Sequence, residues 1–214
     1  MTVAAAVLIV ALGDSTTAGT PHFKSPIEAP PNGAGDAQAP FPYWLEHTHP
    51  GWTVLNRGVN GERSDQIAAR FDRDVLAQRS SGAASAPGVP RFVIIIAGVN
   101  DVYQGRSAES VIAQLRAMYD RAKAAHIPVI AGSIVPYNTA TPEQNARMHA
   151  INDWIRAEAA RDTNVTFVDT RKAAATDNNI DMLSGSPDGL HPDVNGYHRM
   201  ADALAAAIAA KIKS

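Results

Sequence analysis

Four short clusters in the sequence combine small residues with side chains that can take part in catalysis. They are Gly13-Asp14-Ser15-Thr16, Gly58-Val59-Asn60-Gly61, Gly98-Val99-Asn100-Asp101 and Asp188-Gly189-Leu190-His191-Pro192. A serine hydroxyl becomes an effective nucleophile when a positioned base removes its proton, and imidazole is the base best suited to neutral pH. Asp188 and His191 stand three residues apart, so the carboxylate can hydrogen-bond the imidazole and fix its tautomer. We therefore predict a catalytic triad of Ser15, Asp188 and His191.

The two middle clusters supply the other groups that such a reaction needs. Attack of a serine on a carbonyl group places negative charge on the carbonyl oxygen, and hydrogen-bond donors must stabilise that charge. The backbone N–H groups of Ser15 and Gly61 and the side-chain amide of Asn100 are suitable donors. Glycine at position 61 allows an unusual backbone angle and the close approach of a substrate. We predict that these three residues form an oxyanion hole.

Five apolar runs lie between and before these clusters, and they predict the strands that position them. The runs are Ala5–Leu12, Trp52–Arg57, Phe92–Ala97, Ile127–Ile134 and Val165–Val168. The middle three are mostly unbroken and rich in valine and isoleucine, which is typical of parallel strands covered on both faces. In an open parallel sheet, ligands bind at the carboxyl ends of the strands. Three of the clusters directly follow a run, so we expect them to meet at that edge.

Helical patterns alternate with the apolar runs. Ser64 and Ser107 are expected to cap two helices, and Thr141-Pro142-Glu143-Gln144 is a strong signal for the start of a third. A final helix after Asp193 ends in lysines, whose charge suits a helix C-terminus. This alternation predicts an α/β fold with helices on both faces of a parallel sheet. We expect residues 1–214 to form a single domain.

One long stretch does not fit the alternation. Residues 21–43 contain six prolines and the sequence Asn32-Gly33-Ala34-Gly35, which indicates an ordered loop insertion with little secondary structure. Because it follows Ser15 closely, we expect it to form a wall of the substrate pocket, with apolar surface from Phe23, Phe41 or Tyr43. The alternative is a surface loop or an oligomer contact. Further candidate pocket residues follow other strands at the same edge, although they could instead pack the loops: Tyr103, Pro136 and Tyr137.

The four clusters together resemble the SGNH hydrolase superfamily, also called GDSL esterases and lipases. The resemblance extends from Gly13 to Pro192, with the blocks in the family's order. It implies a three-layer α/β/α sandwich whose five-stranded parallel sheet has the order 2-1-3-4-5. It also implies the same triad, with Gly61 and Asn100 as oxyanion donors. This sequence departs from the family's pattern at Thr16, where the family usually has leucine, and in the length of the Pro-rich insertion.

The resemblance and the residues together predict a serine esterase that works through an acyl-enzyme on Ser15. We expect its substrate to be a small-molecule ester with a short- to medium-chain acyl group or an aryl group, and we expect no cofactor and no metal. A carbohydrate O-acetyl esterase is the main alternative, followed by a thioesterase or a lysophospholipase. A protein that keeps the fold as an inactive binding module would be expected to lose the serine, asparagine or histidine, and all are present here.

Composition limits the other classes of function. The net charge of -2 and the interspersed charges argue against a nucleic-acid partner. The sequence has no cysteine, which excludes disulfides, thiol catalysis and cysteine-based zinc sites. No apolar run is long enough to span a bilayer. The sequence leaves open the oligomeric state and the compartment, whether cytoplasmic or exported with a signal peptide that this chain lacks.

A metal-centred site is the remaining alternative. One histidine with a few carboxylates and amides is a poor ligand set for a transition metal, and no paired-histidine or Asp-x-His spacing supports one. The residues concerned are Asp14, Asn60, Asn100, Asp188 and His191. We interpret Asp14 and Asp101 as structural groups that bond backbone N–H groups around the loops, rather than as participants in the reaction.

Overall fold

A five-stranded parallel sheet forms the centre of the molecule. The computed structural model describes residues 7–79 and 90–213 of the chain. The strands lie in the order β4-β1-β5-β6-β7 and all neighbouring pairs are parallel. This confirms the predicted order 2-1-3-4-5. The strands are β1 (Val7–Gly13), β4 (Trp52–Gly58), β5 (Phe92–Ile96), β6 (Val129–Gly132) and β7 (Val165–Val168).

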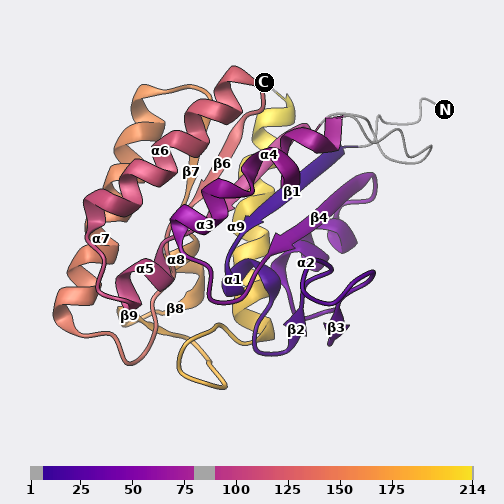
Figure 1. Cartoon of the computed structure of the whole chain (residues 1–214). Helices are drawn as coiled ribbons and strands as arrows, with labels where there is room; N and C mark the ends of the chain where they lie inside the picture. The colour runs from indigo at the N-terminus through magenta and orange to yellow at the C-terminus, as the bar shows by residue number, and fades with distance from the viewer. Residues whose placement is uncertain (1–6, 80–89, 214) are drawn as a thin grey trace.

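Two layers of helices cover the sheet, which gives the predicted three-layer sandwich (Figure 1). Successive residues of a strand point to opposite faces, so Val10 and Leu12 enter one core while Ile9 and Ala11 enter the other. The helices of the first face are α3 (Ser64–Ala69), α4 (Phe71–Asp74), α6 (Ala108–Ala124) and α7 (Pro142–Arg161). Those of the second face are α2 (Phe41–Thr48), α8 (Thr170–Ala174) and α9 (Val194–Lys213).

Two of the three predicted helix caps are confirmed. The hydroxyls of Ser107 and Thr141 each accept a hydrogen bond from the backbone N–H three residues ahead, and Thr141 also takes part in a capping box. The prediction for Ser64 was wrong, because Arg63 occupies the N-cap of α3 and Ser64 is its first helical residue. The Ser64 hydroxyl instead donates to the Asp101 carboxylate at 2.9 Å. A contact between residues so distant in sequence left no local signal.

The Pro-rich insertion has more regular structure than the sequence indicated. It contains an antiparallel pair formed by β2 (Phe23–Lys24) and β3 (Ala34–Gly35), and α2 already begins at Phe41. A second small antiparallel pair, β8 (Ala175–Thr176) and β9 (Asn179–Leu183), follows α8. Both pairs escape prediction from periodicity because at least one strand of each has two residues.

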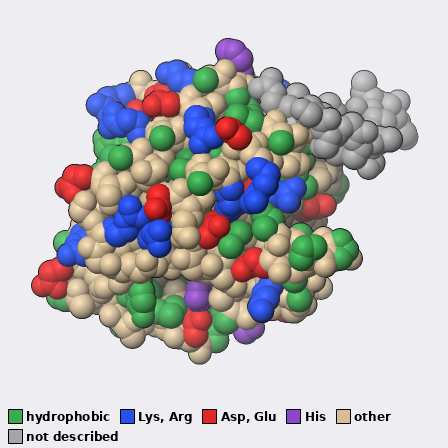
Figure 2. All heavy atoms as spheres, viewed as in Figure 1, with side chains coloured by type: hydrophobic (Ala, Val, Ile, Leu, Met, Phe, Trp, Pro, Cys, Tyr) green, Lys and Arg blue, Asp and Glu red, His purple; other side chains and the backbone are tan. Residues whose placement is uncertain are grey.

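The surface carries charges of both signs. Figure 2 shows acidic and basic side chains interspersed over the face that bears α3, α4 and α6. Several of them are paired there, including Arg121 with Asp72 at 2.7 Å and Arg106 with Asp65 at 2.9 Å. Among the helices that the structure describes, none combines the length and the hydropathy needed to cross a membrane.

Candidate active site

The nucleophile loop lies at the carboxyl end of β1, the strand between β4 and β5 in the sheet. Asp14 caps the short helix α1 (Ser15–Ala18), and its Oδ1 accepts a hydrogen bond from the Thr16 N–H at 2.9 Å. Gly13 cannot be replaced without a clash, because an added Cβ would lie 2.2 Å from the Thr17 hydroxyl oxygen. Ser15 begins the helix, so its own N–H has no carbonyl partner within that helix.

The predicted triad residues lie within hydrogen-bond distance of one another. His191 Nε2 is 2.9 Å from Ser15 Oγ, and His191 Nδ1 is 2.7 Å from Asp188 Oδ2. The other carboxylate oxygen, Asp188 Oδ1, accepts the backbone N–H groups of Leu190 and His191, both at 2.9 Å. Contacts within the turn from Asp188 to His191 therefore orient both the carboxylate and the imidazole. The fold of the chain then places this imidazole beside the Ser15 hydroxyl.

The electrostatics of this turn keep its carboxylate ionised. Burial opposes ionisation of Asp188, but hydrogen bonds from the His191 side chain and from the backbone of Leu190 and His191 outweigh it. Together they hold the pKa of the Asp188 carboxyl below its usual range. An ionised carboxylate on Nδ1 leaves Nε2 as the basic nitrogen, which is the one that faces the serine.

Asp14 and Asp101 are buried and bond to groups around the loops. Burial raises the pKa of Asp14 to about 6, although the hydrogen bond from the Thr16 backbone acts in the opposite direction. Asp101 accepts both the N–H and the hydroxyl of Ser64, at 2.7 and 2.9 Å. Neither carboxylate forms a hydrogen bond with Ser15 or His191 in the described structure.

The three candidate oxyanion donors come from three separate segments of the chain. Gly61 lies in an exposed turn with φ of 74°, and within residues 7–79 and 90–213 its N–H has no hydrogen-bond acceptor. Asn100 lies in α5 (Val99–Tyr103), and its Nδ2 donates to the Glu62 carbonyl at 2.9 Å. Since a side-chain amide has two N–H groups, the second one remains for a ligand. Asn100 thus fixes the loop that carries Gly61.

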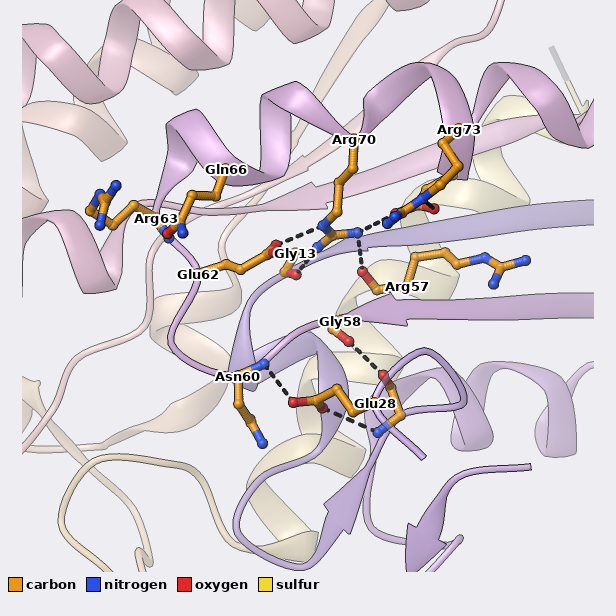
Figure 3. Close-up of polar contacts among 12 residues, drawn as sticks. Gly13, Glu28, Arg57, Gly58, Asn60, Glu62, Arg63, Gln66, Arg70 and Arg73 are labelled. Carbon is orange, nitrogen blue, oxygen red and sulfur yellow. Dashed lines mark hydrogen bonds and ion pairs between the residues drawn. The ribbon is translucent and has the colours of Figure 1, made fainter. Parts of the chain in front are cut away.

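A buried arginine, Arg70, joins the nucleophile loop to the loop that carries Gly61. Its Nη2 donates to the Gly13 carbonyl at 2.7 Å, its Nη1 to the Arg57 carbonyl at 2.8 Å, and its Nε to the Glu62 carboxylate at 2.6 Å (Figure 3). An ion pair with Asp74 one helical turn away completes its contacts. Sequence reasoning missed Arg70. The available signal was an arginine beside the apolar positions of a helix, with a carboxylate four residues later.

A cavity of about 140 Å³ opens beside the triad. Its lining is Ser15, Thr16, Val99, Asn100, Tyr103, Tyr137, Leu190 and His191. Of the candidate pocket residues, Tyr103 and Tyr137 therefore lie in this cavity, with their rings 5.7 Å apart. Pro136 is buried and does not line it.

The insertion residues Phe23 and Tyr43 lie elsewhere. They line a second cavity of about 360 Å³ between the insertion, α2 and β4. Phe41, the third candidate, is fully buried in the core under α9. The structure thus does not place these side chains in the cavity at Ser15. A Pro-rich segment can begin next to the nucleophile and still direct its aromatic side chains toward the edge strand.

A metal would need several ligands in one place. In the part of the chain that the structure describes, no three histidine, aspartate or glutamate side chains are grouped so that they could hold a metal ion. That the reaction needs no metal stays a prediction.

Comparisons with known proteins agree with this architecture. The chain is 27% identical over 171 residues to an acetylxylan esterase from Geobacillus stearothermophilus, covering 72% of this chain and 71% of that protein. It is similar to the structure of a putative lipolytic protein of the G-D-S-L family from Desulfitobacterium hafniense, with 24% identity, a TM-score of 0.72 and coverage of 94% and 99%. A member of the lipolytic protein G-D-S-L family from Veillonella parvula gives a TM-score of 0.73 at 19% identity, with coverage of 95% and 99%. The model of the GDSL-like lipase/acylhydrolase family matches residues 11–199. The chain belongs to the GDSL-like lipase/acylhydrolase family.

Proposed function

We propose that the protein hydrolyses carboxylic esters through an acyl-enzyme on Ser15. The observation that supports this most directly is the continuous path from Asp188 through His191 to the Ser15 hydroxyl, with donor–acceptor distances of 2.7 and 2.9 Å. Family membership supports an esterase in general terms, and the hydrogen-bonded path supports the roles that we propose for Ser15, His191 and Asp188.

The reaction proceeds in two halves. His191 Nε2 takes the Ser15 proton as Oγ attacks the ester carbonyl, and then gives this proton to the departing alcohol. In the second half, His191 removes a proton from water, the resulting oxygen attacks the acyl-enzyme, and the proton returns to Ser15 as the acid leaves. Asp188 stabilises the imidazolium in both halves. The Ser15 and Gly61 N–H groups and the Asn100 amide stabilise the oxyanion.

The cavity favours short acyl groups over long ones. Its volume of about 140 Å³ also has to accommodate the reacting ester group beside Ser15. Tyr103 and Tyr137 form an aromatic boundary, and Leu190 adds apolar surface. We therefore expect turnover to fall as the acyl chain lengthens beyond a few carbons.

An O-acetyl carbohydrate esterase is the second candidate. The relative of known activity that favours it is the acetylxylan esterase, 27% identical over 171 residues. The acetyl group is the shortest common acyl group and suits the small cavity. The exposed Tyr103, at 55% exposure, offers a ring on which a sugar could stack at the rim.

An ester panel tests both candidates. Nitrophenyl esters from acetate to octanoate should show the highest kcat/KM at the short end, and acetylated xylo-oligosaccharides should be compared at matched concentrations. Ser15→Ala is the control, and it should lose several orders of magnitude in kcat while its thermal unfolding stays unchanged. An alanine variant that remains active would contradict the acyl-enzyme. A preference for sugar acetates over nitrophenyl acetate would favour the second candidate.

A further inference from the structure

The direction of the Gly61 N–H, a proposed oxyanion donor, depends on the type of the turn in which Gly61 lies. Residues Val59–Glu62 form a turn that closes with the Glu62 N–H donating to the Val59 carbonyl at 3.4 Å. Gly61 has φ of 74°, whereas Asn60 is not among the residues with positive φ. These angles define a type II turn. In a type I turn, the central peptide is rotated by about half a turn, which would direct the Gly61 N–H the opposite way.

Two side chains of the Pro-rich insertion form hydrogen bonds with the backbone of this loop. Glu28 Oε1 accepts the Asn60 N–H at 2.9 Å, and the fully buried Ser25 donates its hydroxyl to the Gly58 carbonyl at 2.5 Å. Figure 3 shows Glu28 and Arg70 on opposite sides of the loop that runs from Gly58 to Glu62. The turn is therefore held between the insertion and the Arg70 side chain.

We propose that Glu28 is a positioning residue that holds the Val59–Glu62 turn in the form that presents the Gly61 N–H to the oxyanion. This inference rests on the proposed ester hydrolysis. It gives the insertion a role in catalysis that does not require contact with the substrate, consistent with Phe23 and Tyr43 lying in a separate cavity.

Glu28 is itself held in place, which a positioning residue requires. Its second oxygen, Oε2, accepts the Ser25 N–H at 3.4 Å, and the backbone N–H groups of Glu28 and Ala29 both donate to the Ser25 carbonyl, at 3.0 and 2.9 Å. Prolines on either side of this segment limit its conformations. A carboxylate that accepts a backbone N–H makes a stronger bond than a neutral acceptor. The insertion thus holds Glu28 in a fixed position, from which its carboxylate contacts the Val59–Glu62 turn.

Removing the charge of Glu28 distinguishes a positioning role from direct electrostatic stabilisation of the oxyanion. A negative side chain near the turn repels a developing oxyanion, so the charge of Glu28 does not stabilise the oxyanion directly. The contribution of Glu28 must come from the hydrogen bond with the Asn60 N–H, which fixes the Val59–Asn60 peptide beside the peptide that carries the Gly61 N–H. Glutamine keeps an acceptor oxygen in the same place and removes the charge, so Glu28→Gln should retain most of the function that Glu28→Ala loses.

The experiment compares Glu28→Ala, Glu28→Gln and a matched control, Glu46→Ala. Glu46 also accepts a backbone N–H from β4, that of Val54 at 3.2 Å, but at a position remote from the turn. Glu28→Ala should lower kcat on a nitrophenyl acetate by about tenfold, because a displaced donor stabilises the transition state less well. KM should stay within about twofold. Phenylboronic acid, which forms a tetrahedral adduct with serine, should lose affinity in parallel with kcat.

A second measurement does not depend on activity. Amide hydrogen exchange at residues 58–62 should accelerate in Glu28→Ala, and both Glu28→Gln and Glu46→Ala should keep the wild-type exchange rates and kcat. Unchanged exchange in Glu28→Ala would overturn the inference, and so would a rise in KM with kcat preserved. If Ser15→Ala proved as active as the wild type, ester hydrolysis at Ser15 would fail instead, and the exchange rates would still decide whether Glu28 holds the turn.

Discussion

The two sides of the candidate active site are built in different ways. The base side is the turn that contains Asp188 and His191, where one carboxylate binds two backbone N–H groups and the imidazole of the same short segment. The oxyanion side draws its donors from three segments of the chain. Arg70 and Asn100 tie these segments together by donating to the carbonyls of Gly13 and Glu62, which are 57 and 38 positions away in the sequence. Base-side geometry is therefore encoded locally, whereas oxyanion-side geometry depends on the whole fold.

The strongest test of this difference is Asp188→Asn. An amide at this position can donate to His191 Nδ1 and so favour the wrong tautomer, which should lower kcat by about 10⁴-fold. Ser186→Ala is the matched control. The Ser186 hydroxyl donates to the His191 carbonyl at 2.6 Å and lies 3.4 Å from Asp188 Oδ1, but it does not contact the imidazole or Asp188 Oδ2, the oxygen that bonds the imidazole. Its loss should therefore change kcat much less. Steady-state kinetics on one nitrophenyl ester measure both variants. Equal effects would mean that the whole turn, rather than the Asp188–His191 contact, limits the reaction.

Asn100→Ala tests the oxyanion side. Removing one such donor should lower kcat by about 10²–10³-fold and change KM much less, because the bond strengthens as charge develops on the oxygen. The variant also releases the Glu62 carbonyl, so amide exchange at residues 58–62 should be measured with the kinetics. A raised KM with preserved kcat would identify Asn100 as a residue that binds the substrate in its ground state.

The same contrast explains what the sequence could and could not predict. The strands follow from continuous apolar runs, the caps at Ser107 and Thr141 from side chains that bond three residues ahead, and the pairing of Asp188 with His191 from their spacing. Each of these signals lies within one short segment. Most of the contacts that order the oxyanion side join residues tens of positions apart, such as Ser64 and Asp101.

Long-range contacts also explain the two features of the insertion that the sequence did not reveal. Its aromatic side chains pack in the core and beside the edge strand β4, and its polar side chains reach the Val59–Glu62 turn. Composition predicted a stiff segment anchored near Ser15. Which of its side chains would face the site depended on a chain reversal formed by strands of two residues, Phe23–Lys24 and Ala34–Gly35.

A further effect should appear in stability rather than in catalysis, and its dependence on pH should have opposite signs for Asp14 and Asp188. Burial raises the pKa of Asp14 to about 6 from 3.8, so folding is favoured by its neutral form and loses stability as pH rises between these values. The shift of about two units corresponds to about 3 kcal/mol. Asp14→Asn should therefore gain stability over the wild type by up to about 3 kcal/mol at pH 7 relative to pH 4.

The pKa of Asp188 is instead lowered by its hydrogen bonds, although burial opposes them. Asp188→Asn should thus be less stable than the wild type at pH 7, with a deficit that shrinks as the pH falls through the Asp188 pKa. Urea unfolding of the three proteins from about pH 2.5 to 8 measures both differences, because the Asp188 pKa lies below 3.8 and that of Asp14 lies above it. The stability of the two variants relative to the wild type should change in opposite directions with pH. A change in the same direction would contradict the contrast between Asp14, a buried helix cap, and Asp188, the ionised partner of the base.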